Sequence, residues 1–277
     1  MSAVSDTNQP LKKSNQPGWK WSHIYFLAVY FLALYLVYWL LSTKNFLVPN
    51  LIYWLVAFLA SLTILLMVLG ILKKNISYVW WEVLLLVFGF SGVWILSLAA
   101  LPFWAAVMVA GAMVLLPYIW PLTLWHDLTF VLGSMGIGLF LAIRFPFSVL
   151  LVCSLGVVAY EYSRQKQTQM ATLLSEAFRT GLPPGILLPI KPIGWFKAIE
   201  ETWQAGSGMV ISLLPLIMLS AIGLRLAHVG WYWYLLMAVT VLATEIVWGQ
   251  DKQDRLRSWI FLAVAVGFYA LMGIANL

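Results

Sequence analysis

Long apolar runs separated by short polar segments dominate the pattern of this chain. The runs are about 20 residues long, which is the length that a helix needs to cross a bilayer, and Pro, Asn, Lys and Arg stand between them. Nine runs can be counted: Ser22–Ser42, Asn50–Leu72, Ser77–Ala100, Phe103–Ile119, Trp125–Ile143, Phe145–Tyr162, Ala205–Leu224, Gly230–Trp248 and Ser258–Asn276. Because unpaired backbone groups cannot face lipid, each run is expected to be a helix. The pattern therefore predicts an all-α, polytopic membrane protein with nine transmembrane helices.

The polar segments divide the chain into three parts. Residues 1–21 are rich in Ser, Asn, Gln and Lys and are expected to be a disordered cytoplasmic arm, not a cleavable signal. Residues 22–277 form one transmembrane domain, interrupted by a cytoplasmic loop at 163–203. Within this loop the apolar spacing of Met170–Phe178 predicts a short helix on the lipid headgroups, and Gly185–Ile190 is expected to be re-entrant or strand-like.

Composition supports the membrane class. Hydrophobic residues make up 63% of the chain and charged residues 9%, which leaves too little polar surface for a water-soluble globule of 277 residues. Cys153 is the single cysteine, and no His or Cys spacing fits a metal site, so neither a metal nor another cofactor is expected. The net charge of +6 is spread between the apolar runs without a basic patch, which argues against nucleic acid as a partner. The lipid bilayer is the expected environment.

The basic residues also predict the orientation. If the N-terminus is cytoplasmic, every Lys and Arg except Lys44, Arg144 and Arg225 falls on the cytoplasmic side of the nine runs. Positively charged residues favour that side of a membrane. The sequence therefore predicts a cytoplasmic N-terminus and an external C-terminus.

Four acidic residues lie near the predicted cytoplasmic ends of apolar runs: Glu82, Asp127, Glu161 and Glu245. Ionisable groups at membrane depth are costly and often functional. Each carboxylate on its own is compatible with an interfacial residue that is paired or hydrated. Together at one end of the helices, the four also fit a shared polar cavity, and both interpretations stay open.

Two short motifs carry a family resemblance. One apolar run ends in Tyr160-Glu161, and the run after the loop opens with Gly206-Ser207-Gly208-Met209 and contains Pro215. This arrangement resembles the presenilin and signal-peptide-peptidase family of intramembrane aspartyl proteases. In that family one aspartate follows a Tyr, a second ends a Gly-x-Gly-Asp motif, and the two hydrolyse peptide bonds inside the bilayer.

The resemblance extends over about half of the chain. Ala159–Pro189 is similar to the passage from the sixth span into the cytoplasmic loop, especially in archaeal members, which would imply a prokaryotic plasma membrane. Trp125–Leu128, followed by Gly133–Gly138, is similar to their fifth span, and Gly206–Gly223 to their seventh. The family's nine spans also agree with the count made here.

The functional positions depart from the family. Glu161 and Met209 occupy the places of the two aspartates, and the family's Pro-Ala-Leu motif is absent from Gln250–Ser258. An aspartyl dyad needs two carboxylates that share a proton, and Met209 cannot titrate. Unless Glu82, Asp127 or Glu245 takes its place, no dyad forms. The sequence therefore indicates a pseudoenzyme, in which Gly206 and Gly208 either let helices approach closely or line a cavity, and Pro215 kinks its helix.

The leading hypothesis is a non-catalytic homologue that binds transmembrane helices or partner proteins through a groove around its sixth, seventh and ninth spans. One alternative is an active intramembrane endopeptidase that uses Glu161 with an unusual partner. Another is a small-solute transporter.

Overall fold

The computed structural model describes residues 19–42, 76–98, 100–164, 185–189, 192–198, 201, 208–248 and 258–275. In this part of the chain there are eight α-helices, one 3₁₀ helix and two strands. Their bounds are α1 Trp19–Ser42, α3 Ile76–Leu98, α4 Phe103–Ile119, α5 Thr123–Arg144, α6 Phe147–Arg164, β1 Gly185–Pro189, η1 Pro192–Phe196, β2 Gly208–Ser212, α9 Leu213–Val229, α10 Trp231–Trp248 and α11 Ser258–Ala275.

The structure is helical, as predicted, and two of its helices are long and apolar enough to cross a membrane. These are Ile24–Ser42 and Thr123–Arg144. Six shorter apolar helices accompany them in the described residues. The predicted span Asn50–Leu72, the headgroup helix Met170–Phe178 and most of the N-terminal arm lie outside the described residues. The arm was predicted to reach residue 21, whereas α1 already begins at Trp19. The count of nine spans stays a prediction.

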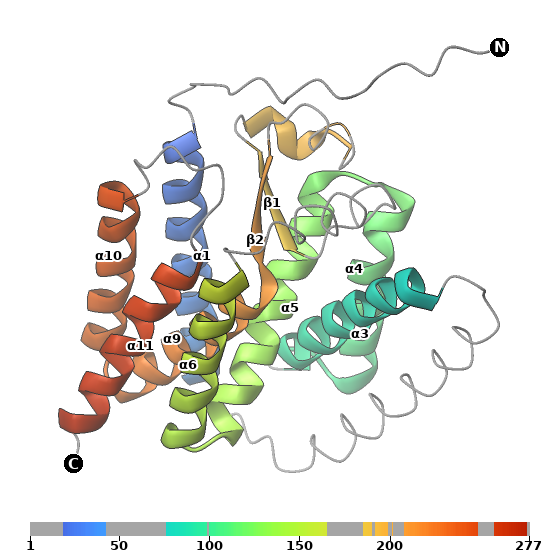
Figure 1. Ribbon diagram of the computed structural model, residues 1–277. Coiled ribbons are helices and arrows are strands. Elements are labelled where there is room, and N and C mark those ends of the chain that lie inside the picture. The colour runs from blue at the N-terminus through green and yellow to red at the C-terminus, as the bar shows by residue number, and fades with distance from the viewer. Residues whose placement is uncertain are drawn as a thin grey trace.

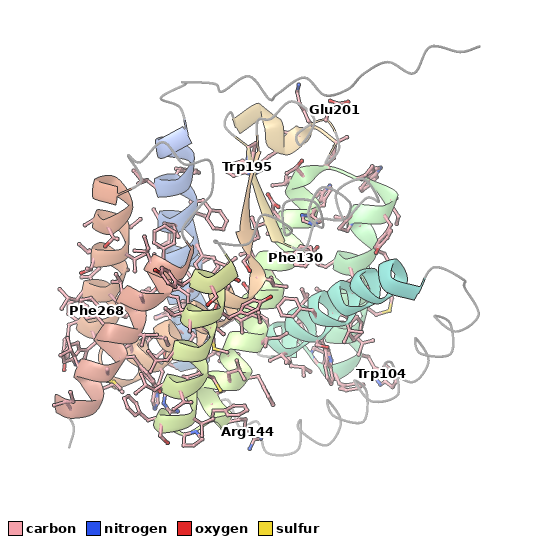
Figure 2. All side chains as sticks on the ribbon, viewed as in Figure 1. Trp104, Phe130, Arg144, Trp195, Glu201 and Phe268 are labelled. Carbon is pink, nitrogen blue, oxygen red and sulfur yellow. The ribbon has the colours of Figure 1, made fainter. Side chains whose placement is uncertain are left out.

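The helices form two groups around α5 and α9. Figure 1 shows α1, α10 and α11 on one side and α3 and α4 on the other, with α6 in front and the two strands between the groups. The helix α9 is buried along most of its length by α5, α11, α10 and α1. In Figure 2, Phe130 of α5 lies in the interior, whereas Trp104 of α4 lies at the outer surface, where 77% of it is exposed.

Glycines bring α3 and α5 into close contact. Gly92 of α3 faces Gly133 and Gly136 of α5, and the backbones of the two helices meet directly at these positions. Small residues allow such an approach, and in lipid the resulting van der Waals contact is a main source of helix association. The glycines of the predicted fifth span therefore position α5 against α3.

A buried polar cluster joins α1, α5 and α9. The hydroxyl of Tyr30 donates to the carbonyl oxygen of Leu216 at 3.0 Å and also contacts the hydroxyls of Ser134 and Ser220. The two serine residues are fully buried, and Tyr30 is 1% exposed. Because a buried hydroxyl without a partner is costly, this cluster specifies how the three helices pack.

The two strands form an antiparallel ribbon, in which Gly185 pairs with Ser212 and Pro189 with Gly208. The prediction of a strand-like piece at Gly185–Ile190 is confirmed by β1. Ile186 is fully buried and anchors β1, which contacts α5, η1 and α1. The ribbon is a feature that a purely all-α fold does not contain.

The prediction of a helix from Ala205 to Leu224 was wrong at both ends. Gly208–Ser212 is a strand, and α9 begins at Leu213 and continues to Val229. The β-branched residues Val210 and Ile211 favour a strand, and here they pair with β1. Pro215 consequently lies in the first turn of α9, where its missing N–H breaks no hydrogen bond, so the predicted kink was also wrong.

Candidate functional site

The site is built at the C-terminal end of α6 and the start of α9. Glu161 lies in the last turn of α6, and only 6% of it is exposed. Its neighbour Tyr160 is 49% exposed, so the two members of the predicted Tyr-Glu motif lie on different sides of the helix. Successive helical residues point about 100° apart, which explains the difference. Glu161 is therefore the member of this motif that faces the interior.

Glu161 accepts a hydrogen bond from Ser212. The Oγ of Ser212 donates to Oε1 of Glu161 over 2.7 Å, and 51 positions of sequence separate the two residues. A side-chain hydrogen bond of this kind contributes about 0.5–1.5 kcal/mol, and leaving a buried acceptor without its donor costs more. This bond connects α6 to the junction between β2 and α9.

Ser212 belongs to both a strand and the start of a helix. It is the last residue of β2, where it pairs with Gly185, and it is the N-cap of α9, with φ −61° and ψ 142°. A serine at an N-cap usually accepts a hydrogen bond from an amide of the first helical turn. Ser212 makes no such side-chain bond, and its hydroxyl donates to Glu161 instead.

The residues of the second predicted motif lie on the strand side of this junction. Met209 and Gly208 belong to β2, where their backbones pair with Leu188 and Pro189. Gly208 therefore lies on a strand and not, as predicted, on a helix. Gly206 and Ser207 lie outside the described residues. The structure thus places Ser212, three positions after Met209, next to Glu161.

Asp127 belongs to a second buried polar cluster, at the start of α5. Its Oδ1 lies 3.2 Å from Nδ1 of His126, and the imidazole of His126 is fully buried against the ring of Phe130, at 4.5 Å between ring centroids.

The start of α5 is fixed to the segment after η1, because both the amide and the hydroxyl of Thr123 donate to the carbonyl oxygen of Lys197.

The structure does not describe the side chains of the other two predicted acids. Glu82 lies on α3 and Glu245 on α10, and their side chains are outside the described part of the structure. The shared polar cavity stays a prediction. Within the described residues, no group of three or more His, Cys, Asp or Glu side chains is arranged to hold a metal ion.

Sequence reasoning missed Ser212. A serine followed by Leu213, Leu214 and Pro215 is a helix-start signal, because Ser is a favoured N-cap and Pro is tolerated in the first turn. This signal would have moved the start of α9 past Met209 and brought Ser212 into view.

The chain matches no protein-family model, no curated protein and no solved structure. The resemblance to the presenilin family therefore rests on the sequence motifs alone.

Proposed function

We propose that this chain is a presenilin-like, polytopic membrane protein that binds a membrane segment of a partner protein beside α6, α9 and the ribbon, without aspartyl protease chemistry. In this proposal it spans a prokaryotic plasma membrane nine times, with the N-terminus in the cytoplasm and the C-terminus outside. The bound segment is an apolar transmembrane helix whose cytoplasmic end unwinds.

The observation that carries the proposal is the bond between Ser212 and Glu161. An aspartyl protease keeps two carboxylates close enough to share one proton, so that one activates water and the other protonates the substrate carbonyl. Here Oε1 of Glu161 faces a serine hydroxyl, which does not supply a second negative charge. The described contact at Oε1 is therefore with a neutral donor, which supports a binding role for the site.

The ribbon supports an extended ligand. β2 pairs with β1 along one edge, and no other strand of the described residues pairs with its second edge. A strand edge without a neighbouring strand can accept an extended peptide as an additional strand, with main-chain hydrogen bonds giving affinity. Leu214, two residues after β2 in the first turn of α9, is 43% exposed and offers apolar contact. A transmembrane helix with an unwound end matches both features.

Site-directed photo-cross-linking tests the binding. Purified full-length protein in nanodiscs would carry p-benzoylphenylalanine at Leu214, or at Val239 of α10 as a control of similar exposure. Two synthetic transmembrane peptides would be offered, one uninterrupted and one with Gly and Pro in its cytoplasmic third. We expect cross-links to the interrupted peptide from Leu214 only. Equal cross-linking from both positions, or a preference for the uninterrupted peptide, would contradict the proposal.

A cleavage assay tests the chemistry separately. The same peptides would be incubated with wild-type protein, Glu161→Gln and Ser212→Ala. A product that requires Glu161 and one of Glu82, Asp127 or Glu245, and that persists in Ser212→Ala, would show an aspartyl-type dyad and overturn this part of the proposal.

A further inference from the structure

The junction between β2 and α9 presents a serine hydroxyl to a buried carboxylate. The Oγ of Ser212 donates its proton to Oε1 of Glu161 at 2.7 Å, and it does not cap α9. A carboxylate in this position can accept the proton as Oγ attacks an electrophile, which is the relation between a nucleophile and its general base. Glu161 is 94% buried, so its carboxylate is held in place by surrounding groups.

The backbone after Ser212 provides donors for a negative charge. The amides of Leu213 and Leu214 open α9, and the first amides of a helix have no acceptor within the helix. The helix dipole adds a partial positive charge at the same point. Ser212 ends β2 and starts α9 with an ordinary extended backbone, φ −61° and ψ 142°, and not with the strained turn of the nucleophile elbow. The amide of Leu213 follows it directly in the chain.

The two members of the pair differ in exposure. Ser212 is half-buried and is followed closely by the exposed Leu214, whereas Glu161 is 6% exposed. The hydroxyl is therefore the more accessible member of the pair.

We propose that Ser212 is a nucleophile activated by Glu161 and that a peptide carbonyl of the bound extended segment acylates it. The identity of this substrate rests on the proposed function, whereas the reactivity of Ser212 does not. Oγ forms a bond to the carbonyl carbon as Glu161 takes the hydroxyl proton, and the amides of Leu213 and Leu214 bind the oxyanion. The C–N bond then breaks, and Glu161 gives its proton to the leaving amine.

The second half of the reaction regenerates the site. Water adds to the serine ester and passes a proton to Glu161. The ester C–O bond breaks, the carboxylic acid product leaves, and the proton returns to Oγ of Ser212. The net reaction is hydrolysis of one peptide bond, and it requires no metal and no oxidant.

A fluorophosphonate probe tests the nucleophile without any partner segment. In the expected reaction Oγ of Ser212 bonds to phosphorus while fluoride and a proton are released. The probe would be added to full-length protein in nanodiscs, and the adduct would be located by mass spectrometry of peptides. We expect labelling at Ser212, loss of the adduct in Ser212→Ala, and labelling slowed about a hundredfold or more in Glu161→Gln, the contribution of a positioned base.

Ser154→Ala is the matched control, because Ser154 is a fully buried serine of α6, the helix that also carries Glu161. It should leave the labelling rate unchanged. Absence of the adduct from folded wild-type protein would overturn the proposal. An equal labelling rate in wild-type protein and Glu161→Gln would also overturn it. Labelling without segment cross-linking from Leu214 would instead contradict the proposed function and leave the nucleophile intact.

Discussion

Gly136 of α5 lies against the carbonyl oxygen of Gly92 of α3, at a separation that admits no side chain. A Cβ added to Gly136 would lie 1.8 Å from that oxygen, and one added to Gly92 would lie 2.0 Å from the carbonyl oxygen of Gly133. Both obstacles are backbone atoms, which cannot rotate away. The close packing of these two helices therefore requires glycine, whose side chain is a single hydrogen atom, at these positions.

We expect Gly136→Ala to destabilise the protein by about 3 kcal/mol, the upper part of the range for overpacked cores. Gly111→Ala on α4 is the control, because a Cβ there meets nothing within 4 Å. It should be neutral or stabilising, by up to about 1 kcal/mol, since alanine is the better helix former. Unfolding in mixed micelles measures both. Equal effects of the two substitutions would contradict the packing described here.

Ser212→Ala should destabilise the protein by about 1–3 kcal/mol, because it removes a donor from the buried carboxylate of Glu161. A double-mutant cycle with Glu161→Gln isolates the pair from other effects of each change. We expect a coupling free energy above about 0.5 kcal/mol. Additive effects would mean that the two side chains do not interact in solution.

Tyr30→Phe should cost about 1 kcal/mol, the typical net value of one hydrogen bond. The loss is limited because both serine hydroxyls keep other acceptors, Ser134 the carbonyl oxygen of Val131 and Ser220 that of Leu216. Tyr35→Phe, on the exposed side of α1, is the control and should have no measurable effect. Thermal unfolding of both variants in the same detergent checks the difference.

Arg225→Met should destabilise the end of α5. Nη1 of Arg225 donates to the carbonyl oxygen of Ala142 at 2.7 Å, and carbonyls of a last helical turn have no partner inside the helix. We expect a loss of about 1.5–3 kcal/mol, the range for hydrogen bonds to charged groups. His228→Gln, an exposed change in the last turn of α9, should be nearly neutral. Faster amide exchange confined to residues 140–144 would confirm the location.

Ile186→Ala should loosen the ribbon. Ile186 is fully buried, and truncating a buried isoleucine costs about 2–5 kcal/mol. Amide exchange of residues 185–189 and 208–212 should accelerate together, because the two strands are paired. Phe196→Ala, at a position that is 66% exposed, should leave this exchange unchanged. Acceleration in β1 without β2 would argue against the pairing.

Much of the helical layout could be predicted from the sequence, because long apolar runs have few alternatives. The predicted run Phe103–Ile119 coincides with α4, and Gly230–Trp248 and Ser258–Asn276 differ from α10 and α11 by one residue at one end. These helices are delimited by polar or helix-breaking residues on both sides, so local chemistry alone determines where they begin and end.

The ribbon and the site could be predicted only in part. In Ala205–Leu224 the apolar pattern is continuous, and continuous apolar residues do not distinguish a buried strand from a helix. The family resemblance drew attention to Met209, whereas pairing with β1 places Ser212 beside Glu161. That contact joins distant segments and depends on tertiary packing, so no local pattern reports it. Glu161 was found because a carboxylate at the end of an apolar run is unusual.

Hydrogen bonds at three successive levels along its axis hold α9 to three different helices. Ser212 joins it to α6 at its start, Leu216 to α1 through the hydroxyl of Tyr30, and Arg225 to α5 near its end. An axial slide of α9 by one residue, about 1.5 Å, would strain all three bonds together. A shift of α6 alone would break only the bond at Ser212 and leave the bonds to α1 and α5 intact, so α6 can separate from α9 at a lower cost in hydrogen bonds than α9 can slide.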